Sequence, residues 1–246
     1  MNEAADNATP PRLRLELAGS SHAGNKREVN EDSFGLLAAH SAAIVADGMG
    51  GLSHGDEASR TVVAHFLDAM HHDSDPASAL MNAHAQIAER SRIPGQRMGS
   101  TVVCAYLDGA AARVLWAGDS RLYRWNGSEL QQVTRDHSFV QEMVDRGALT
   151  LEEAEKHPNR NVVTRAIGAR ADEPPKIDSV TLPVQVDDRL LLCSDGLCGF
   201  LPEARIAELL SRHADPDACC SRLIEATLSE TDAGDNVTVV VARVRG

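Results

Sequence analysis

The sequence predicts an α+β fold in which antiparallel β-sheets form a sandwich with helices packed on the outside. Two turn signals support this prediction: Asp108-Gly109 and Asn126-Gly127 each separate two strand-like runs, as the loops of hairpins do. Helical segments come in pairs before and after the block of strands, and they do not alternate with single strands. This order favours antiparallel sheets over a regular βαβ repeat.

Strands are expected where apolar residues run together or alternate with polar ones. Leu13–Leu17 alternates apolar and charged residues, which is typical of a half-buried strand. Ala42–Ala46 is a short apolar run before a glycine cluster, which predicts a buried strand followed by a tight turn. The other expected strands span residues 101–107, 112–117, 121–125, 129–133, 190–193 and 237–241.

Helices are expected where capping residues precede an amphipathic run. Asp75 followed by Pro76 predicts a helix that starts there and extends to about Glu89. Thr150 and Glu153 have the spacing of a capping box, which predicts a short helix to about His157. Further helices are expected at 57–70, at 204–211 and after residue 216. Residues 1–12 have the composition of a disordered leader, and 13–246 are expected to form a single domain.

The composition narrows the class of partner. The chain has 24 basic and 36 acidic residues and a net charge of −12, which argues against a nucleic-acid partner because that would need a clustered basic surface. Five cysteines without a CxxC pair indicate a reduced, cytoplasmic protein and not a disulfide framework. Since no apolar stretch approaches the ~20 residues of a membrane span, we expect no membrane partner. We also expect a monomer.

Acidic residues stand at the ends of several apolar runs. If these ends converge, their carboxylates share one small space and disfavour each other's ionisation, a cost that divalent cations remove. Ligands that are all oxygen suit Mg²⁺ or Mn²⁺, whereas Zn²⁺ would call for His and Cys. The acids in question are Glu31 and Asp32, Asp47 before the glycine cluster, and Asp119, Asp195 and Asp235.

Other interpretations of these residues are weaker but remain open. A strand-ending Asp beside Gly is an ordinary turn residue, and this alternative is strongest for Asp119. The Gly48–Gly51 segment fails the dinucleotide-binding pattern, because Ser53 stands at its sixth position, and no Gly-Lys-Ser/Thr follows as in a P-loop. The signatures of cysteine-dependent phosphatases, serine hydrolases and zinc proteases are also absent. His137 is expected to order a loop.

Seven motifs occur in the order in which one known family has them. On these motifs the chain resembles the metal-dependent protein phosphatases of the 2C type (the PPM family), in their compact bacterial form, from about Leu15 to Arg245. The resemblance implies two packed antiparallel sheets flanked by pairs of helices, and a single catalytic domain over 13–246. The motifs are Arg27-x-x-Asn30-Glu31-Asp32, Val45-Ala-Asp-Gly-Met-Gly-Gly51, Gly99-Ser-Thr101, Gly118-Asp-Ser-Arg121, Asn161-Val-Val-Thr-Arg-Ala-Ile-Gly168, Ser194-Asp-Gly196 and Asp235-Asn236.

The resemblance also implies which residues hold two Mn²⁺ or Mg²⁺ ions. Asp47 would bridge the two ions, and Asp195 and Asp235 would complete the ligands of one. Glu31 and the backbone carbonyl of Gly48 would serve the other ion, partly through water. A water held between two such ions, ~3.5–4 Å apart, is activated for in-line attack on phosphorus.

Further roles are implied around these ligands. Arg27 would bind the substrate phosphate, Asp32 would support the ligands from behind, and Asp119 would hold a third, weaker ion. Two positions depart from the family pattern. Met49 stands where many eukaryotic members carry a histidine proposed as the general acid, and Gly199 stands where many members carry an acid that would help Asp119.

The implied function is hydrolysis of phosphoserine and phosphothreonine in proteins, opposing a Ser/Thr protein kinase in bacterial signalling. The expected partners are phosphorylated proteins and a cognate kinase. Residues 137–158 correspond to the variable flap of the family and are expected to be mobile and to contact the substrate protein. Two alternatives remain: a pseudophosphatase that binds phosphoproteins, and a hydrolase of small phosphoesters or nucleotides.

Overall fold

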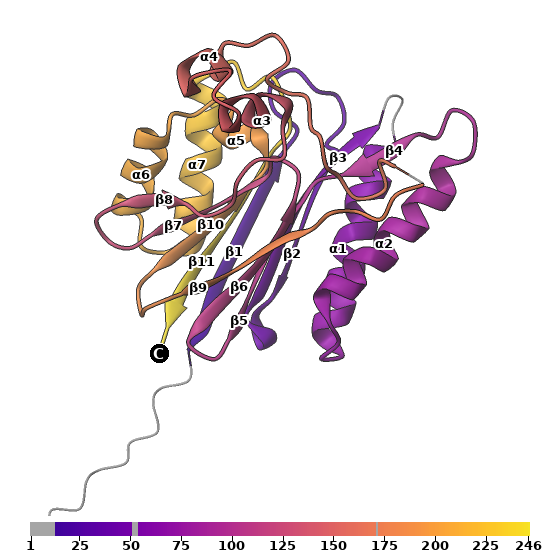
Figure 1. The fold of residues 1–246 in the computed structure, drawn as a ribbon. Coiled ribbons are helices and arrows are strands. Elements are labelled where there is room, and N and C mark those ends of the chain that lie inside the picture. The colour runs from indigo at the N-terminus through magenta and orange to yellow at the C-terminus, as the bar shows by residue number, and fades with distance from the viewer. Residues whose placement is uncertain (1–12, 51–53, 171) are drawn as a thin grey trace, which may run out of the picture.

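The computed structural model of the chain describes residues 13–50, 54–170 and 172–246, so the expected leader, residues 1–12, lies outside the described residues. Two antiparallel sheets pack face to face in the middle of the molecule, and helices cover both outer faces (Figure 1). The predicted fold class, an α+β sandwich of four layers, is therefore confirmed.

Each sheet combines strands from distant parts of the sequence. The first contains, in spatial order, β1 (Arg14–His22), β11 (Val237–Arg245), β10 (Arg189–Cys193), β7 (Arg121–Trp125) and β8 (Leu130–Gln132). The second contains β2 (Asp32–Leu37), β3 (Ala42–Gly50), β5 (Val102–Asp108), β6 (Ala111–Ala117) and β9 (Asp178–Pro183), and β4 (Met98–Ser100) pairs with β3.

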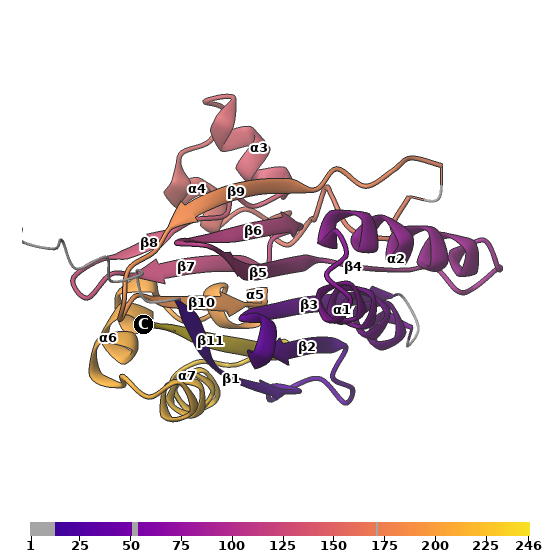
Figure 2. The same cartoon turned by 90° about the horizontal axis from the view of Figure 1, so that it is seen from below.

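One pair of long helices covers each sheet. Helices α1 (Gly55–His71) and α2 (Pro76–Ser91) lie on the second sheet, and α6 (Glu203–Arg212) and α7 (Pro216–Glu230) lie on the first (Figure 2). The shorter helices are η1 (Ala38–His40), α3 (Phe139–Asp145), α4 (Leu151–Glu155) and α5 (Asp195–Cys198). Within the described ranges, no helix combines the length and apolar character needed to cross a membrane.

The core is divided by the alternation of side chains along each strand. In β3, Ala42, Ile44 and Ala46 pack against α1 and α2. Ala43 and Val45 point the opposite way and pack against the other sheet. A third apolar cluster lies between the first sheet and the helices α6 and α7. Odd-numbered residues of β3 therefore face the seam between the two sheets.

The predicted turns and caps lie where the sequence indicated. Gly109 and Gly127 have positive φ, at 62° and 96°, in the two hairpin loops, a backbone region that glycine adopts without strain. The Asp75 side chain accepts hydrogen bonds from the first turn of α2, and Thr150 and Glu153 form the capping box of α4. The first hairpin loop is shorter than expected, because Asp108 pairs directly with Ala111.

Several elements lack a strong sequence signal. Strand β2 begins with Asp32 and contains Gly35, and its register depends on pairing with β3. Strand β9 is an edge strand that is mostly exposed, so it has no apolar run to reveal it. Residues 137–158, expected to be mobile, contain α3 and α4, and their first residues, His137 and Ser138, are buried.

The packing of α1 predicts a large loss of stability when Phe66 is truncated. Phe66 is fully buried between the helix pair and the second sheet, so Phe66→Ala should lower the free energy of unfolding by about 3–5 kcal/mol. Leu151→Ala, where the side chain is 68% exposed, should change it by less than about 0.5 kcal/mol. Urea denaturation measures both, and equal losses would contradict the core position of Phe66.

Candidate metal centre

Two of the predicted acids face each other across neighbouring strands of the second sheet. Asp47 continues the seam-facing side of β3, and Asp32 is its direct partner on β2. Asp32 lies on the same side of β2 as Phe34, which packs into the seam. Like charges at directly opposed positions destabilise a sheet. The register therefore places two carboxylates where they need compensation.

The first sheet brings Asp195 and Asp235 to the same end of the seam. Asp195 follows β10 and begins α5, and Asp235 lies two residues before β11. The two segments are in close contact, because a Cβ atom on Gly196 would lie 1.7 Å from the carbonyl oxygen of Asn236. Only glycine permits this approach. Both predicted acids are thus held by adjacent segments of one sheet.

The pKa values show that these carboxylates converge. Burial, followed by the nearby charges of Asp32, Asp195, Asp119 and Asp235, raises the pKa of Asp47 well above its ordinary value. Burial and Asp235 raise the pKa of Asp195 to about 6. Asp47 and Asp195 lie deep among protein atoms but keep part of their surface open to solvent. The cluster is therefore accessible from outside.

Glu31 and Gly48 are held together at the start of α1. The Glu31 carboxylate accepts a hydrogen bond from the backbone N–H of Gly55 at 3.0 Å, and its carbonyl accepts one from Gly48 at 3.2 Å. A Cβ atom on Gly48 would lie 2.1 Å from the carbonyl oxygen of Gly55. The glycine after Asp47 is thus required by the close passage of three backbone segments.

Asp32 lies beneath the cluster and is almost fully buried. The Ser194 hydroxyl donates to Asp32 Oδ2 at 2.7 Å, and this bond joins the two sheets. Its Oδ1 atom is buried and has no hydrogen-bond partner among the described residues. Burial raises the pKa of Asp32 to about 7, against the lowering effect of the Ser194 and Thr238 hydrogen bonds. Asp32 therefore has one oxygen atom still free to accept.

Asp119 is positioned by a glycine with positive φ and by a buried histidine. Gly118 has a φ of 121°, and its N–H donates to His137 Nδ1 at 3.1 Å. Burial lowers the pKa of His137, so the ring is neutral and this nitrogen can accept. His137 thus orders the loop, as the sequence predicts. Burial, and next the charge of Asp195, raise the pKa of Asp119 to about 8, which places it in the cluster.

Arg27 lies at the exposed rim of the cluster. Its Nη2 donates to Asp235 Oδ2 at 2.9 Å, and 55% of its side chain is exposed. This hydrogen bond raises the pKa of Arg27, and the charges of Glu31 and Asp195 add to the effect. The guanidinium group can therefore bind an anion that approaches from solvent while it remains beside the carboxylates.

Two polar side chains that sequence reasoning did not assign hold the acids in position. The Thr101 hydroxyl accepts from the backbone N–H of Asp47 at 3.1 Å. Asn236 accepts from the N–H of Glu31 at 2.8 Å and donates to the carbonyls of Ala23 and Val29. The motifs Gly99-Ser-Thr101 and Asp235-Asn236 contain both residues, but their partners lie far away in the sequence.

The cluster has the donor chemistry of a site for hard divalent cations. Among the residues that the structure describes, no three His, Cys, Asp or Glu side chains form a preformed set of ligands for a single ion. The carboxyl groups face protein partners instead: Asp195 is within hydrogen-bonding reach of Asp47, and Asp235 pairs with Arg27. The residues still fit Mg²⁺ or Mn²⁺, because all donors are oxygens and a cation would relieve their repulsion.

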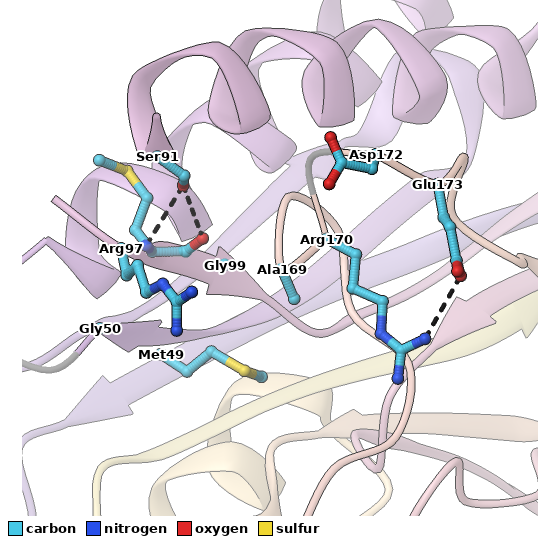
Figure 3. A pocket seen from close by; sticks show the side chains of 10 residues that line it. Met49, Gly50, Ser91, Arg97, Gly99, Ala169, Arg170, Asp172 and Glu173 are labelled. Atoms are coloured by element: carbon cyan, nitrogen blue, oxygen red, sulfur yellow. Dashed lines mark hydrogen bonds and ion pairs between the residues drawn. The ribbon is translucent and has the colours of Figure 1, made fainter. Parts of the chain in front are cut away.

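The two departures from the family pattern lie close to the cluster. Met49 directs its thioether into a pocket beside the site and provides no proton donor (Figure 3). Gly199 closes the short helix α5, and its N–H donates to the carbonyl of Asp195 at 2.7 Å. Neither residue adds a carboxylate to the surroundings of Asp119.

Residues 18–228 match the family described as Protein phosphatase 2C. The chain belongs to the protein phosphatase 2C family. The resemblance drawn from the seven motifs is confirmed. Two curated relatives and one solved structure show how far the similarity to other members of the 2C family extends.

The serine/threonine protein phosphatase PstP of Mycobacterium tuberculosis is 36% identical over 244 residues, which are 94% of this chain and 45% of the relative. The serine/threonine phosphatase stp of Listeria innocua is 33% identical over 202 residues, 76% of this chain and 79% of the relative. The solved catalytic domain of PstP in complex with two manganese ions has a TM-score of 0.82 and 33% identity, over 95% of this chain and 100% of that one. The chain thus spans about half the length of the first relative.

The raised pKa of Asp119 predicts how the stability of an Asp119 variant, measured with a chelator present, depends on pH. A carboxyl with a folded-state pKa of about 8 and an ordinary value of 3.8 binds its proton more tightly when folded, so its contribution to stability falls as pH rises from 4 to 8. Asp119→Asn should therefore gain stability relative to the wild type over this range, by on the order of 1–3 kcal/mol.

Asp187→Asn is the matched control, because Arg243 lowers the pKa of the exposed Asp187 carboxyl. That contribution is fully present above about pH 4, so the difference in stability between the control variant and the wild type should stay constant from pH 4 to 8. Urea denaturation at several pH values in EDTA gives both differences. The same trend in both variants would contradict the burial of charge at Asp119.

Proposed function

We propose that the chain hydrolyses phosphoserine and phosphothreonine in proteins and depends on Mn²⁺ or Mg²⁺. The observation that supports this most strongly is the convergence of buried carboxylates from both sheets, with an arginine at their exposed rim. Such a site holds cations next to a phosphate-binding group. The printed names of the relatives, and the two manganese ions in the solved PstP domain, support the same activity.

The proposed ligands of two ions come from both sheets. Asp47 is proposed to bind both ions, Asp195 and Asp235 to complete one set, and Glu31 and the Gly48 carbonyl to serve the other. Bound cations of this kind lower the pKa of a water molecule and neutralise charge on a phosphoryl group. No covalent phospho-enzyme is required, because water supplies the attacking oxygen.

Three further residues are proposed to act beside these ligands. Arg27 binds the substrate phosphate, since its planar guanidinium matches phosphate oxygens and reaches out from the rim. Asp32 holds the position of the ligands through Ser194 and offers its remaining oxygen to water. Asp119 holds a third, weaker ion. Its buried position near Asp195 supports this role, and the lack of a second acid at Gly199 limits the affinity.

The helices α3 and α4 are proposed to contact the substrate protein. They project from the sandwich, as Figure 2 shows, and the segment is anchored at its base, where His137 accepts from Gly118 and Phe139 donates to Val162. The base therefore connects directly to the loop of Asp119. Most charged residues of the segment are exposed, so they are available to another protein.

We also propose the cellular compartment, the opposing enzyme and the oligomeric state. All five cysteines are free thiols, which supports a reducing compartment such as the cytoplasm. A phosphatase of this class would oppose a Ser/Thr protein kinase in bacterial signalling and act on the phosphoproteins that the kinase produces. We propose that the domain acts as a monomer.

Removal of the ions or of a principal ligand is expected to abolish activity. With Mn²⁺, the chain should hydrolyse a phosphothreonine peptide and p-nitrophenyl phosphate. We expect kcat to fall at least about 10²-fold when EDTA is added, and also in the variants Asp47→Asn and Asp235→Asn. Asp187→Asn, an exposed aspartate outside the cluster, should retain full activity. Circular dichroism checks folding. Activity that survives chelation and both substitutions would end the two-ion proposal.

Activity on p-nitrophenyl phosphate without activity on phosphopeptides would favour a hydrolase of small phosphoesters. Binding of phosphopeptides without hydrolysis in any metal would favour a phosphoprotein-binding regulator.

Replacement of Arg27 tests its role in phosphate binding. Arg27→Gln should lower kcat/KM by about 10–100-fold, mainly through KM, because it removes a charged contact of about 1.5–3 kcal/mol. Lys26→Gln is the matched control, since Lys26 is adjacent, exposed and paired with Asp232 outside the cluster. Steady-state kinetics on one phosphopeptide measures both variants. An equal effect of the two would contradict a specific role for Arg27.

A further inference from the structure

A pocket of about 590 Å³ opens beside the carboxylate cluster. Its walls come from the paired strands β3 and β4, the end of α2 and the segment after Gly168, and Figure 3 shows the side chains that line it. Met49 lies on the same face of β3 as Asp47 and two residues further along, so their Cα atoms are about 7 Å apart. The pocket is therefore the immediate neighbour of the proposed reaction site.

Two arginines contribute to this pocket from opposite walls. Arg97 precedes β4, and Arg170 belongs to the segment after Gly168. Figure 3 shows both guanidinium groups on the side of the pocket where Met49 lies, with the Asp172 carboxylate at the other end. The positive charges of the pocket are thus directed toward the reaction site.

The charges of these arginines are only weakly compensated. Arg97 is exposed and forms no ion pair with any residue of the described ranges. Arg170 pairs with Glu173 at 3.3 Å, but the two side chains are 70% and 65% exposed. Exposed pairs of this kind contribute little and exchange readily with a competing anion. Both guanidinium groups are therefore able to bind a carboxylate or phosphate from another molecule.

Asp172 and Glu173 also line the pocket, so the positive charge is confined to its arginine end, and this end contrasts with the rest of the molecule. The chain has a net charge of −12, and the cluster beside the pocket is itself acidic. An acidic segment of a substrate would be repelled by such a surface unless cations face it. Bound metal ions would compensate the cluster, and Arg97 and Arg170 supply positive charge at the adjacent end of the pocket.

We propose that this pocket selects substrates by binding an anionic side chain two residues from the phosphorylated Ser or Thr. The proposal rests on the phosphatase function proposed above. An extended peptide rises about 3.3 Å per residue and directs every second side chain to the same face. A side chain two residues from the phosphorylated position can therefore reach the pocket while the phosphate lies over the cluster. The ligand is a carboxylate or a second phosphate, the anions that guanidinium groups bind bidentately.

Synthetic phosphothreonine peptides with Mn²⁺ test this specificity. Members of the set differ only in having Ala, Glu, phosphoserine or Lys two residues to either side of the phosphothreonine. The wild type should hydrolyse an anionic peptide with a kcat/KM about ten-fold above that of the Ala peptide, through KM. A comparison of Glu with phosphoserine shows which anion binds better.

Variants locate the effect in the pocket. Arg97→Gln combined with Arg170→Gln should abolish the preference, while the rates on the Ala peptide and on p-nitrophenyl phosphate stay unchanged. Arg97→Glu should shift the preference toward the Lys peptide. Arg92→Gln is the matched control, because Arg92 lies close in sequence and is exposed, but it pairs with Glu89 and does not line the pocket.

The outcomes separate this proposal from the proposed function. Hydrolysis of all peptides at equal rates, or a preference that survives the double substitution, would overturn the specificity pocket and leave the phosphatase function intact. Failure of the wild type to hydrolyse any peptide or p-nitrophenyl phosphate would overturn the function and the pocket together.

Discussion

Repulsion among carboxylates at one end of the seam between the two sheets is the constraint on which the structure depends. Asp32 and Asp47 are direct partners in the β2–β3 register, and Asp195 and Asp235 approach them from the other sheet. The fold keeps these charges together through hydrogen bonds that cross the seam, from Ser194 to Asp32 and from Glu31 to Asn236. A network of this kind is costly without cations, and that cost favours ion binding.

Close backbone packing makes this convergence possible. Gly48 lets the segment of Asp47 pass close to the backbone of Glu31 and Gly55, and Gly196 lets the segment of Asp195 pass close to the backbone after Asp235. A single added carbon atom at either glycine would collide with a carbonyl group. The glycines next to Asp47 and Asp195 therefore allow the segments that carry the acids to pack closely. They are structural requirements of the site, although they supply no side chain to it.

The sequence was informative where a local pattern determines the outcome. Apolar runs, hairpin glycines and helix caps predicted most long elements, and the acids at the ends of Ala42–Ala46 and Leu190–Cys193 predicted where charge would gather. Strand β9 could not be predicted, because an exposed edge strand has no apolar run. The Thr101 bond to Asp47 joins residues 54 apart, and the Asn236 bond to Glu31 joins residues 205 apart. Neither partner follows from local spacing, and the same holds for the placement of Arg97 and Arg170 around one pocket.

The distribution of the clustered acids over both sheets has a consequence for the lifetime of the protein. Because the proposed ligands belong to both sheets, an ion bound to them would fasten one half of the sandwich to the other. Any species that binds only the folded chain adds stability in proportion to the logarithm of its concentration. The folded population would therefore rise and fall with the supply of divalent cation. In a cell short of manganese or magnesium, catalysis would stop, and the protein itself would also be lost to unfolding and proteolysis.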